Sequence, residues 1–387
     1  MMRRGAKQGY TLVEMLVAML IFSVVMTLIC VSFTRIVKNS SQLTKSAETD
    51  IAGLIGLEVM RSDVELAGFG LPWSVPDTVN YVEAEGAWQF VNSCSGGCPG
   101  ARPSLYNDNP PSAYRVGDNV GFNGSDYLVL KGTPLGDRSV CRSWCYVTYG
   151  GITKPSRVTP ELDISKKPRV IVLKNEVLSD GPSRSLVTDQ SGESYAINFT
   201  DPLDKTFAPS EKTDTYLAYG VADTNLRFPF NRSDYYIDQG SDRISSFCNK
   251  GTGILYKAVY DHDVTPKYRK YPLLDCVADM QVVLYFDTNG DDVFDNSGPS
   301  GEDDPTPKKL REELKEVRVY VMAQQGKRDP SFMYPVSAPS SVILVGDPGR
   351  PEVGHVWSEQ ALTAKFGASW RNYHWKIYTI VVQPKNL

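Results

Sequence analysis

The chain has few histidines and lacks the short motifs on which common enzyme chemistry depends. Its three histidines, His262, His355 and His374, lie far apart in 387 residues. No G-x-S-x-G, H-E-x-x-H, P-loop or dinucleotide-binding pattern occurs. C-x-x-C-H is also absent, so covalent haem attachment has no support. We therefore expect that the protein is not an enzyme.

The chain also lacks an excess of basic residues. It has 41 Lys and Arg against 45 Asp and Glu, a formal net charge of -4. This balance produces no basic field for nucleic acid, which we do not expect as a partner. The 21 tyrosines, 31 glycines and 25 prolines favour a turn-rich, strand-rich exported domain over a helical bundle.

The one long apolar run lies near the N-terminus. Tyr10–Phe33 follows a basic leader, Met1–Gly9, and its single formal charge is Glu14. Met15–Phe33 is long enough to span a bilayer as a helix, and the cationic leader predicts a cytoplasmic N-terminus. A carboxylate at this depth is costly in lipid without a partner, which makes Glu14 a candidate functional residue.

The order K-Q-G-Y-T-L-V-E resembles the class III signal of type IV pilins and type II secretion pseudopilins. The resemblance implies that a membrane peptidase cuts after Gly9 and that the new terminus, Tyr10, is N-methylated. It also implies that Glu14 pairs with the α-ammonium of a neighbouring subunit, which would stabilise subunit docking. The alternative is a plain signal anchor, in which Glu14 extends toward the headgroups.

Helical character continues beyond the apolar run. Apolar residues in Thr34–Ala67 recur with a period near 3.6, and Gly68 is a suitable helix stop. A helix over 10–67 would be ~85 Å long. The apolar stripe of its second half requires cover from a folded domain. Gly53 and Gly56 either weaken this helix or allow a sheet to approach closely.

Short strand-like runs separated by turn clusters follow, which favours an antiparallel sheet. The predicted strands are 126–131, 145–149, 168–173, 195–199, 216–221 and 254–260.

Four later segments resemble PilW-type minor pilins. Arg61–Gly70 resembles the segment that ends the family's helix. Residues 271–292 resemble a helix or strand of the family that is followed by an acidic turn. Residues 314–324 resemble one of its strands, and residues 370–387 resemble its closing strand. No resemblance is visible between 75 and 250, which we interpret as divergent or as an insertion.

Seven cysteines are present. Cys30 stands alone in the apolar run and is interpreted as a small packing residue. The other six allow 15 pairings, among which we favour Cys248 with Cys276. The remaining four would pair among themselves or, as the alternative, bind zinc: Cys94, Cys98, Cys141 and Cys145.

The segment D-T-N-G-D-D-V-F-D is a candidate Ca²⁺ loop. Oxygen-bearing side chains occupy positions 1, 3, 5 and 9 of an EF-like pattern: Asp287, Asn289, Asp291 and Asp295. Asp292 stands at position 6 where glycine is usual, and Gly298 at position 12 where glutamate is usual. The alternative is a solvated acidic turn between strands.

Taken together, these patterns predict an α+β, pilin-like fold. We expect a cytoplasmic leader over 1–9, a helix over 10–67 that spans the membrane at about 12–33, and an exported β-rich domain over 68–387. The protein would be a single-pass inner-membrane protein with a periplasmic or extracellular C-terminal domain, and would enter the pilus on assembly.

The family resemblance implies a minor pilin that takes part in initiation or the tip complex of a type IV pilus. Its partners would be prepilin peptidase, other minor pilins and the major pilin. Two alternatives stay open: a type II secretion pseudopilin of the GspJ kind, and a tip adhesin that uses residues 75–250.

Overall fold

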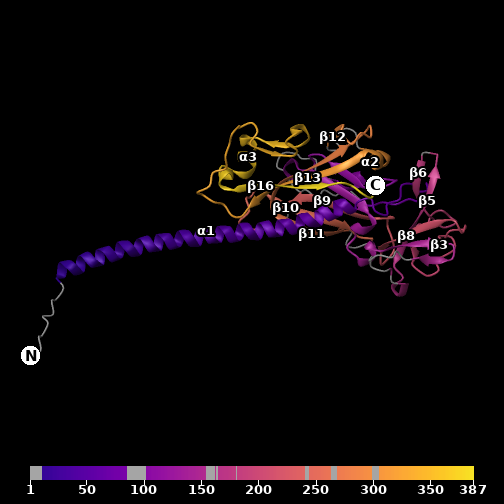
Figure 1. Cartoon of the computed structure of the whole chain (residues 1–387), viewed down its shortest axis with the longest axis horizontal. Coiled ribbons are helices and arrows are strands. Elements are labelled where there is room, and N and C mark those ends of the chain that lie inside the picture. The colour runs from indigo at the N-terminus through magenta and orange to yellow at the C-terminus, as the bar shows by residue number, and fades with distance from the viewer. Residues whose placement is uncertain are drawn as a thin grey trace, which may run out of the picture.

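In the computed structural model of the chain, one long helix carries a β-rich domain on its C-terminal half (Figure 1). The structure describes residues 11–84, 102–153, 162, 164–179, 181–239, 244–262, 268–298 and 305–387. The apolar helix followed by antiparallel sheets confirms the predicted α+β fold class.

Helix α1 extends from Leu12 to Leu66 without a break. Its first part, Leu12–Val37, has a mean hydropathy of 2.7, is not buried by the rest of the chain, and is long enough to cross a membrane. Gly68 follows the helix with φ 85°, the left-handed conformation that glycine adopts without strain. The predicted bounds, 10–67, therefore agree with the observed helix to within two residues.

The main sheet has eight strands, and its neighbouring strands are antiparallel. Their spatial order is β1 (Tyr114–Gly117), β2 (Tyr127–Gly132), β9 (Asn231–Asp238), β10 (Gly253–Tyr260), β11 (Tyr268–Phe286), β13 (Leu314–Gln325) and β16 (His374–Val382), with β12 (Asn296–Gly298) paired to β11. The segment 271–292, predicted as a helix or a strand, lies largely in strand β11.

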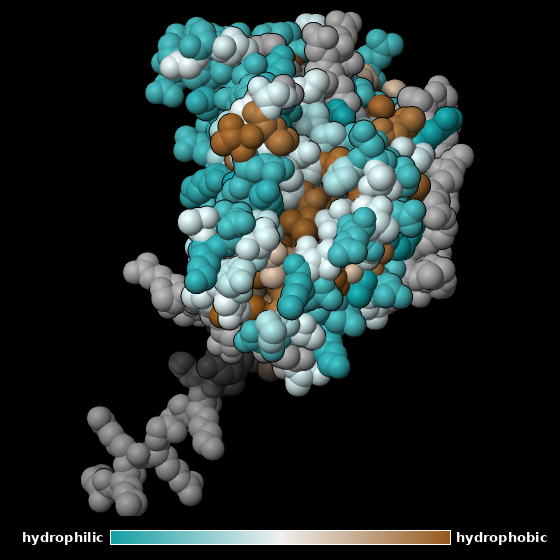
Figure 2. All heavy atoms as spheres, turned by 90° about the vertical axis from the view of Figure 1, so that its right-hand side faces the viewer, coloured by the Kyte–Doolittle hydropathy of each residue, from teal (hydrophilic) through white to brown (hydrophobic). Residues whose placement is uncertain are grey.

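A second, six-stranded sheet lies at the end of the domain away from the start of α1 (Figure 1). Its order is β4 (Gly151–Thr153), β3 (Trp144–Thr148), β8 (Thr215–Ala222), β5 (Arg169–Leu178) and β6 (Gly181–Leu186), with β7 (Ile197–Asn198) paired to β5. Seen from this end, the described surface is mostly hydrophilic, with hydrophobic residues in small separate groups (Figure 2).

Smaller elements complete the domain. They are the strand pair β14 (Ile343–Val345) and β15 (His355–Trp357), the helices α2 (Pro307–Glu313) and α3 (Glu359–Phe366), and the 3-10 turns Pro103–Tyr106, Phe122–Gly124, Thr133–Leu135, Ser139–Arg142, Ile164–Lys166, Pro351–Val353 and Trp370–Asn372.

The second sheet is inserted between two neighbouring strands of the main sheet. The chain leaves at Gly132, the end of β2, and returns at Asn231, the start of β9; these two residues are paired across the ladder. Residues 75–250, which we interpreted from sequence as divergent or inserted, thus contribute β1, β2 and β9 to the main sheet.

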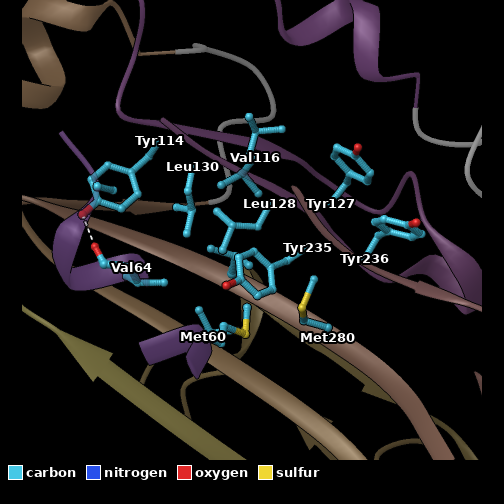
Figure 3. Packing of buried hydrophobic residues seen from close by; sticks show 14 of the residues in the cluster. Met60, Val64, Tyr114, Val116, Tyr127, Leu128, Leu130, Tyr235, Tyr236 and Met280 are labelled. Atoms are coloured by element: carbon cyan, nitrogen blue, oxygen red, sulfur yellow. Dashed lines mark hydrogen bonds between the residues drawn. The ribbon is translucent and has the colours of Figure 1, made fainter. Parts of the chain in front are cut away.

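Helix α1 covers one face of the main sheet. Met60 and Val64 point into a cluster with Leu128, Tyr235 and Met280, all fully buried (Figure 3). Fully burying a side chain of this size stabilises the fold by about 1.5–3 kcal/mol. The second half of the helix is therefore held to the domain by ordinary core packing, as its apolar stripe predicts.

Candidate functional site

The first turn of α1 is a capping box formed by Thr11 and Glu14. The Glu14 backbone N–H donates to Thr11 Oγ1 at 3.3 Å. In return the Glu14 carboxylate accepts from the Thr11 backbone N–H at 2.8 Å and from its hydroxyl at 2.9 Å. The sequence T-L-V-E contains the signal for this box, T-x-x-E, a feature that the charge of Glu14 alone does not reveal.

The Glu14 side chain keeps capacity for another partner. Both bonds from Thr11 reach Oε2, so Oε1 has no hydrogen-bond partner among the residues that the structure describes. The side chain is exposed, and a carboxylate accepts at both oxygens. It can therefore receive a cationic group from outside the chain. Gly9 and Tyr10, the predicted cleavage and N-methylation residues, lie outside the described residues.

A second carboxylate, Asp63, fixes the other end of α1 to the domain. It is 5% exposed and accepts from the Tyr235 hydroxyl at 2.6 Å. Lys257 of β10 forms a salt bridge with the same carboxylate. Nearby, the Tyr114 hydroxyl donates to the Val64 carbonyl at 2.6 Å (Figure 3). Asp63 lies in the segment Arg61–Gly70, but the sequence indicates no role for its carboxylate, because its partners lie far away along the chain.

Gly56 brings the helix backbone directly onto β11. A Cβ at this position would lie 2.2 Å from the Leu273 carbonyl oxygen. At Gly53 the nearest atom to such a Cβ would be Leu274 Cδ1, the movable end of a side chain, at 3.2 Å. Of the two roles that the sequence left open for these glycines, close approach of a sheet therefore applies to Gly56.

A buried ionic cluster ties the segment before β1 to the main sheet. Lys131 Nζ lies 2.7 Å from Glu83 and 2.7 Å from Asp108, while Arg232 lies 2.9 Å from Glu83 and 2.8 Å from Asp234. Three acids thus face these two cations and a third, Arg115, which lies 2.8 Å from Asp108. Because the charges balance, this cluster has a structural role.

The predicted Ca²⁺ loop is folded around its own hydrogen bonds. Asp287 accepts from the backbone N–H groups of Gly290 (2.6 Å) and Asp292 (3.0 Å). Asp295 Oδ2 accepts from the Thr288 N–H at 2.9 Å and from its hydroxyl at 2.8 Å.

The remaining two candidate ligands take part in the same network. Asn289 Nδ2 donates to Asp291 and Asp295, each at 3.3 Å. Within the described part of the chain, no three His, Cys, Asp or Glu side chains converge as a metal site requires. The arrangement is that of a hydrogen-bonded acidic turn, and Ca²⁺ binding stays a prediction.

The cysteines occupy different settings. Cys248 and Cys276 form a disulfide. Cys141 is not part of a disulfide, which contradicts the predicted pairing. Its thiol donates to the Val221 carbonyl at 3.1 Å. Burial raises the pKa of this thiol to about 12. Cys145 is also buried. Cys94 and Cys98 lie outside the described residues.

Comparison with known proteins identifies the N-terminal segment alone. Residues 4–29 match a family described as the prokaryotic N-terminal methylation motif. No curated protein and no solved structure matches the chain. The matched residues include Gly9, Tyr10 and Glu14 and the first turns of α1. A prepilin-type motif therefore heads this chain, which supports a membrane-anchored type IV pilin or pseudopilin that prepilin peptidase processes.

Proposed function

We propose that the protein is a minor pilin that acts in the initiation or tip complex of a type IV pilus. The observation that carries this proposal is a methylation-motif helix that continues, unbroken, from a membrane-spanning segment into a large docked β domain. The late segments that resemble PilW-type proteins lie in β11, β13 and β16, the strands that α1 covers.

Assembly would use the two ends of α1 differently. Cleavage after Gly9 frees the amino group of Tyr10 and leaves the apolar helix in the mature protein. The exposed Glu14 carboxylate then pairs with the α-ammonium of a neighbouring pilin, since each charge is costly in hydrocarbon without the other. Asp63 and the buried face of α1 hold the β domain in place during this step.

Co-purification from membranes tests the role of Glu14. We expect Glu14→Ala to insert and to be shortened normally but to lose the other minor pilins. Ser23→Ala is the control, because it removes a hydroxyl that donates only within α1, to Leu20 at 2.8 Å. Partners retained by Glu14→Ala at the wild-type level would refute the docking role.

Mass spectrometry of the N-terminal peptide tests the cleavage site. The wild-type protein should begin with N-methylated Tyr10. Gly9→Leu should stay full length, because the peptidase requires a small residue before the cut. A shortened Gly9→Leu chain would refute this assignment. If the co-purified subunits belong to a type II secretion system, the pseudopilin alternative replaces the proposed one.

The position of the second sheet favours one additional role, in surface binding at the pilus tip. This sheet lies at the end of the domain away from the start of α1 (Figure 1). Because Gly132 and Asn231 are paired, an Asn-Gly turn in place of residues 133–230 would join β2 to β9 as a two-residue hairpin. Pili that form normally but lose surface attachment would support an adhesin; unchanged attachment would refute it.

A further inference from the structure

A loop of the β domain reaches back toward the membrane-spanning part of α1. It joins β13 to the later elements and comprises Gly326–Tyr334. An open cleft separates it from the helix, lined by Cys30, Thr34 and Arg35 on α1 and by Arg328 on the loop. In Figure 1, the yellow end of the domain extends furthest along α1 toward the N-terminus.

The position of this cleft relative to the membrane follows from the length of the apolar segment. Leu12–Val37 contains 26 residues, which at about 1.5 Å each extend about 39 Å. The hydrocarbon core of a bilayer is only about 30 Å thick. With Leu12 at one edge of that core, about the last six residues emerge on the other side. Arg35 and the loop that faces it then lie among the headgroups.

The loop and the helix present positive charge at this depth. Arg35 and Arg328 are both exposed, and Lys327 beside them is half-buried. Arg328 Nη2 donates to Asn372 Oδ1 at 3.2 Å, which orients its guanidinium without neutralising it. The net charge of the whole chain is -4, so the cations at this end of the domain give it a local charge of the opposite sign.

The one acid within the loop, Asp329, keeps its negative charge, so three cations stand against one anion here. Asp329 accepts from the Ser331 hydroxyl at 2.5 Å and from its N–H at 2.9 Å, and it faces His374 at 4.0 Å. The hydrogen bond from the Ser331 hydroxyl, with smaller contributions from the backbone and His374, lowers the pKa of Asp329. Met333 is 65% exposed and adds an apolar side chain beside the cations.

We propose that Gly326–Tyr334 together with Arg35 forms a binding surface for anionic phospholipid headgroups. Arginine and lysine attract such headgroups, and an exposed methionine can enter the boundary between headgroups and acyl chains. The site lies beside the span on the side of the membrane that carries the β domain. It would hold the domain against the bilayer before the subunit joins a filament.

Hydrogen exchange of the full chain in nanodiscs that hold one copy tests this proposal. One set of discs contains phosphatidylcholine alone; in the other, phosphatidylglycerol replaces part of it. We expect peptides covering 326–334 to exchange several-fold more slowly in the anionic discs. The double variant Lys327→Glu/Arg328→Glu should lose this protection, while its thermal unfolding in detergent stays unchanged.

Lys205→Glu/Lys212→Glu is the matched control, with the same charge change at exposed positions of the inserted segment. It should keep the protection. Equal exchange in both lipids would overturn the proposal, and so would loss of protection in the control. Protection that appears only when a disc holds several copies would assign the loop to a neighbouring subunit instead. None of these outcomes depends on whether the protein acts in a pilus.

Discussion

Glu14 and Asp63 lie on the same helix in opposite settings. Glu14 is exposed in the apolar span, whereas Asp63 is buried beneath the β domain. The sequence marks Glu14, because a lone charge in an apolar run is conspicuous. It gives Asp63 a place in the segment Arg61–Gly70 but no role, because Tyr235 and Lys257 come close only after β9 and β10 have formed.

Removal of the Asp63 carboxylate should destabilise the domain more than removal of the Tyr235 hydroxyl that donates to it. Asp63→Ala leaves Lys257, whose side chain is 13% exposed, without its anion, and we expect a loss of about 3–5 kcal/mol. Tyr235→Phe should lose about 1–2 kcal/mol. Denaturant unfolding in detergent, followed by tryptophan fluorescence, measures both.

The double variant Asp63→Ala/Lys257→Met provides the control for this pair. It removes the charge and its partner together, so it should recover part of the loss seen in Asp63→Ala. If the double variant loses the sum of the stabilities lost by Asp63→Ala and Lys257→Met alone, a direct interaction between the two side chains is contradicted.

Asp108 makes stability depend on pH. Burial raises the pKa of Asp108, but attraction to Lys131 and hydrogen bonds from Arg115 and Lys131 together outweigh it and hold the pKa below its usual value. The contribution is therefore present above the unfolded pKa of about 3.9 and is lost as pH falls through the folded pKa.

Thermal unfolding of wild type and Asp108→Asn across acidic pH tests this dependence. The wild type should be the more stable near pH 6, and the difference in melting temperature should shrink as the pH falls below about 4. A difference that does not change with pH would show that Asp108 acts through its shape alone.

At the scale of the element, Gly56 and Gly53 predict opposite responses of α1 to the same substitution. Alanine favours a helix interior over glycine by about 1 kcal/mol. At Gly56 the added Cβ would meet the Leu273 carbonyl at 2.2 Å, so we expect Gly56→Ala to destabilise by about 1–3 kcal/mol.

Gly53→Ala is the control within the same helix. Its added methyl meets the movable end of the Leu274 side chain at 3.2 Å and the Tyr378 hydroxyl at 3.6 Å, an ordinary van der Waals distance, so stability should stay unchanged or rise by up to about 1 kcal/mol. Unfolding free energies of the two variants decide the matter. Equal effects would indicate that helix propensity, rather than contact with β11, governs both sites.

Elements with a clear local pattern could be predicted from the sequence. The long helix and strands such as β2, β10 and β13 occur where periodicity or strand-like apolar runs place them. Strand β9, N-R-S-D-Y-Y-I-D, was missed, because it begins with polar residues that are nevertheless buried. Arg232 and Asp234 are accommodated there by the ionic cluster, whose members come from distant segments. No local pattern contains that information.

At the scale of the whole molecule, the disulfide should contribute to the stability of the main sheet. Cys248 and Cys276 are separated by 28 residues, and a loop of this length implies a contribution of about 3–4 kcal/mol. We expect Cys248→Ser/Cys276→Ser to unfold at correspondingly lower urea concentration. Reductant should bring the wild type to the same midpoint.

Cys30→Ser is the control for this measurement, because Cys30 is an exposed residue of the apolar helix outside the disulfide. It should unfold like the wild type and respond to reductant in the same way. A wild-type midpoint that reductant leaves unchanged would contradict a stabilising role for the disulfide.

The continuity of α1 has a mechanical consequence. Its 55 residues contain no proline and form a rod of about 82 Å. The second half of this rod is packed against the main sheet, so α1 and the β domain move together as one rigid body. A tilt of about 5° at the membrane end displaces the other end by about 7 Å over this length. A force that shifts or tilts the membrane end of α1 therefore also shifts or tilts the second sheet, at the opposite end of the domain.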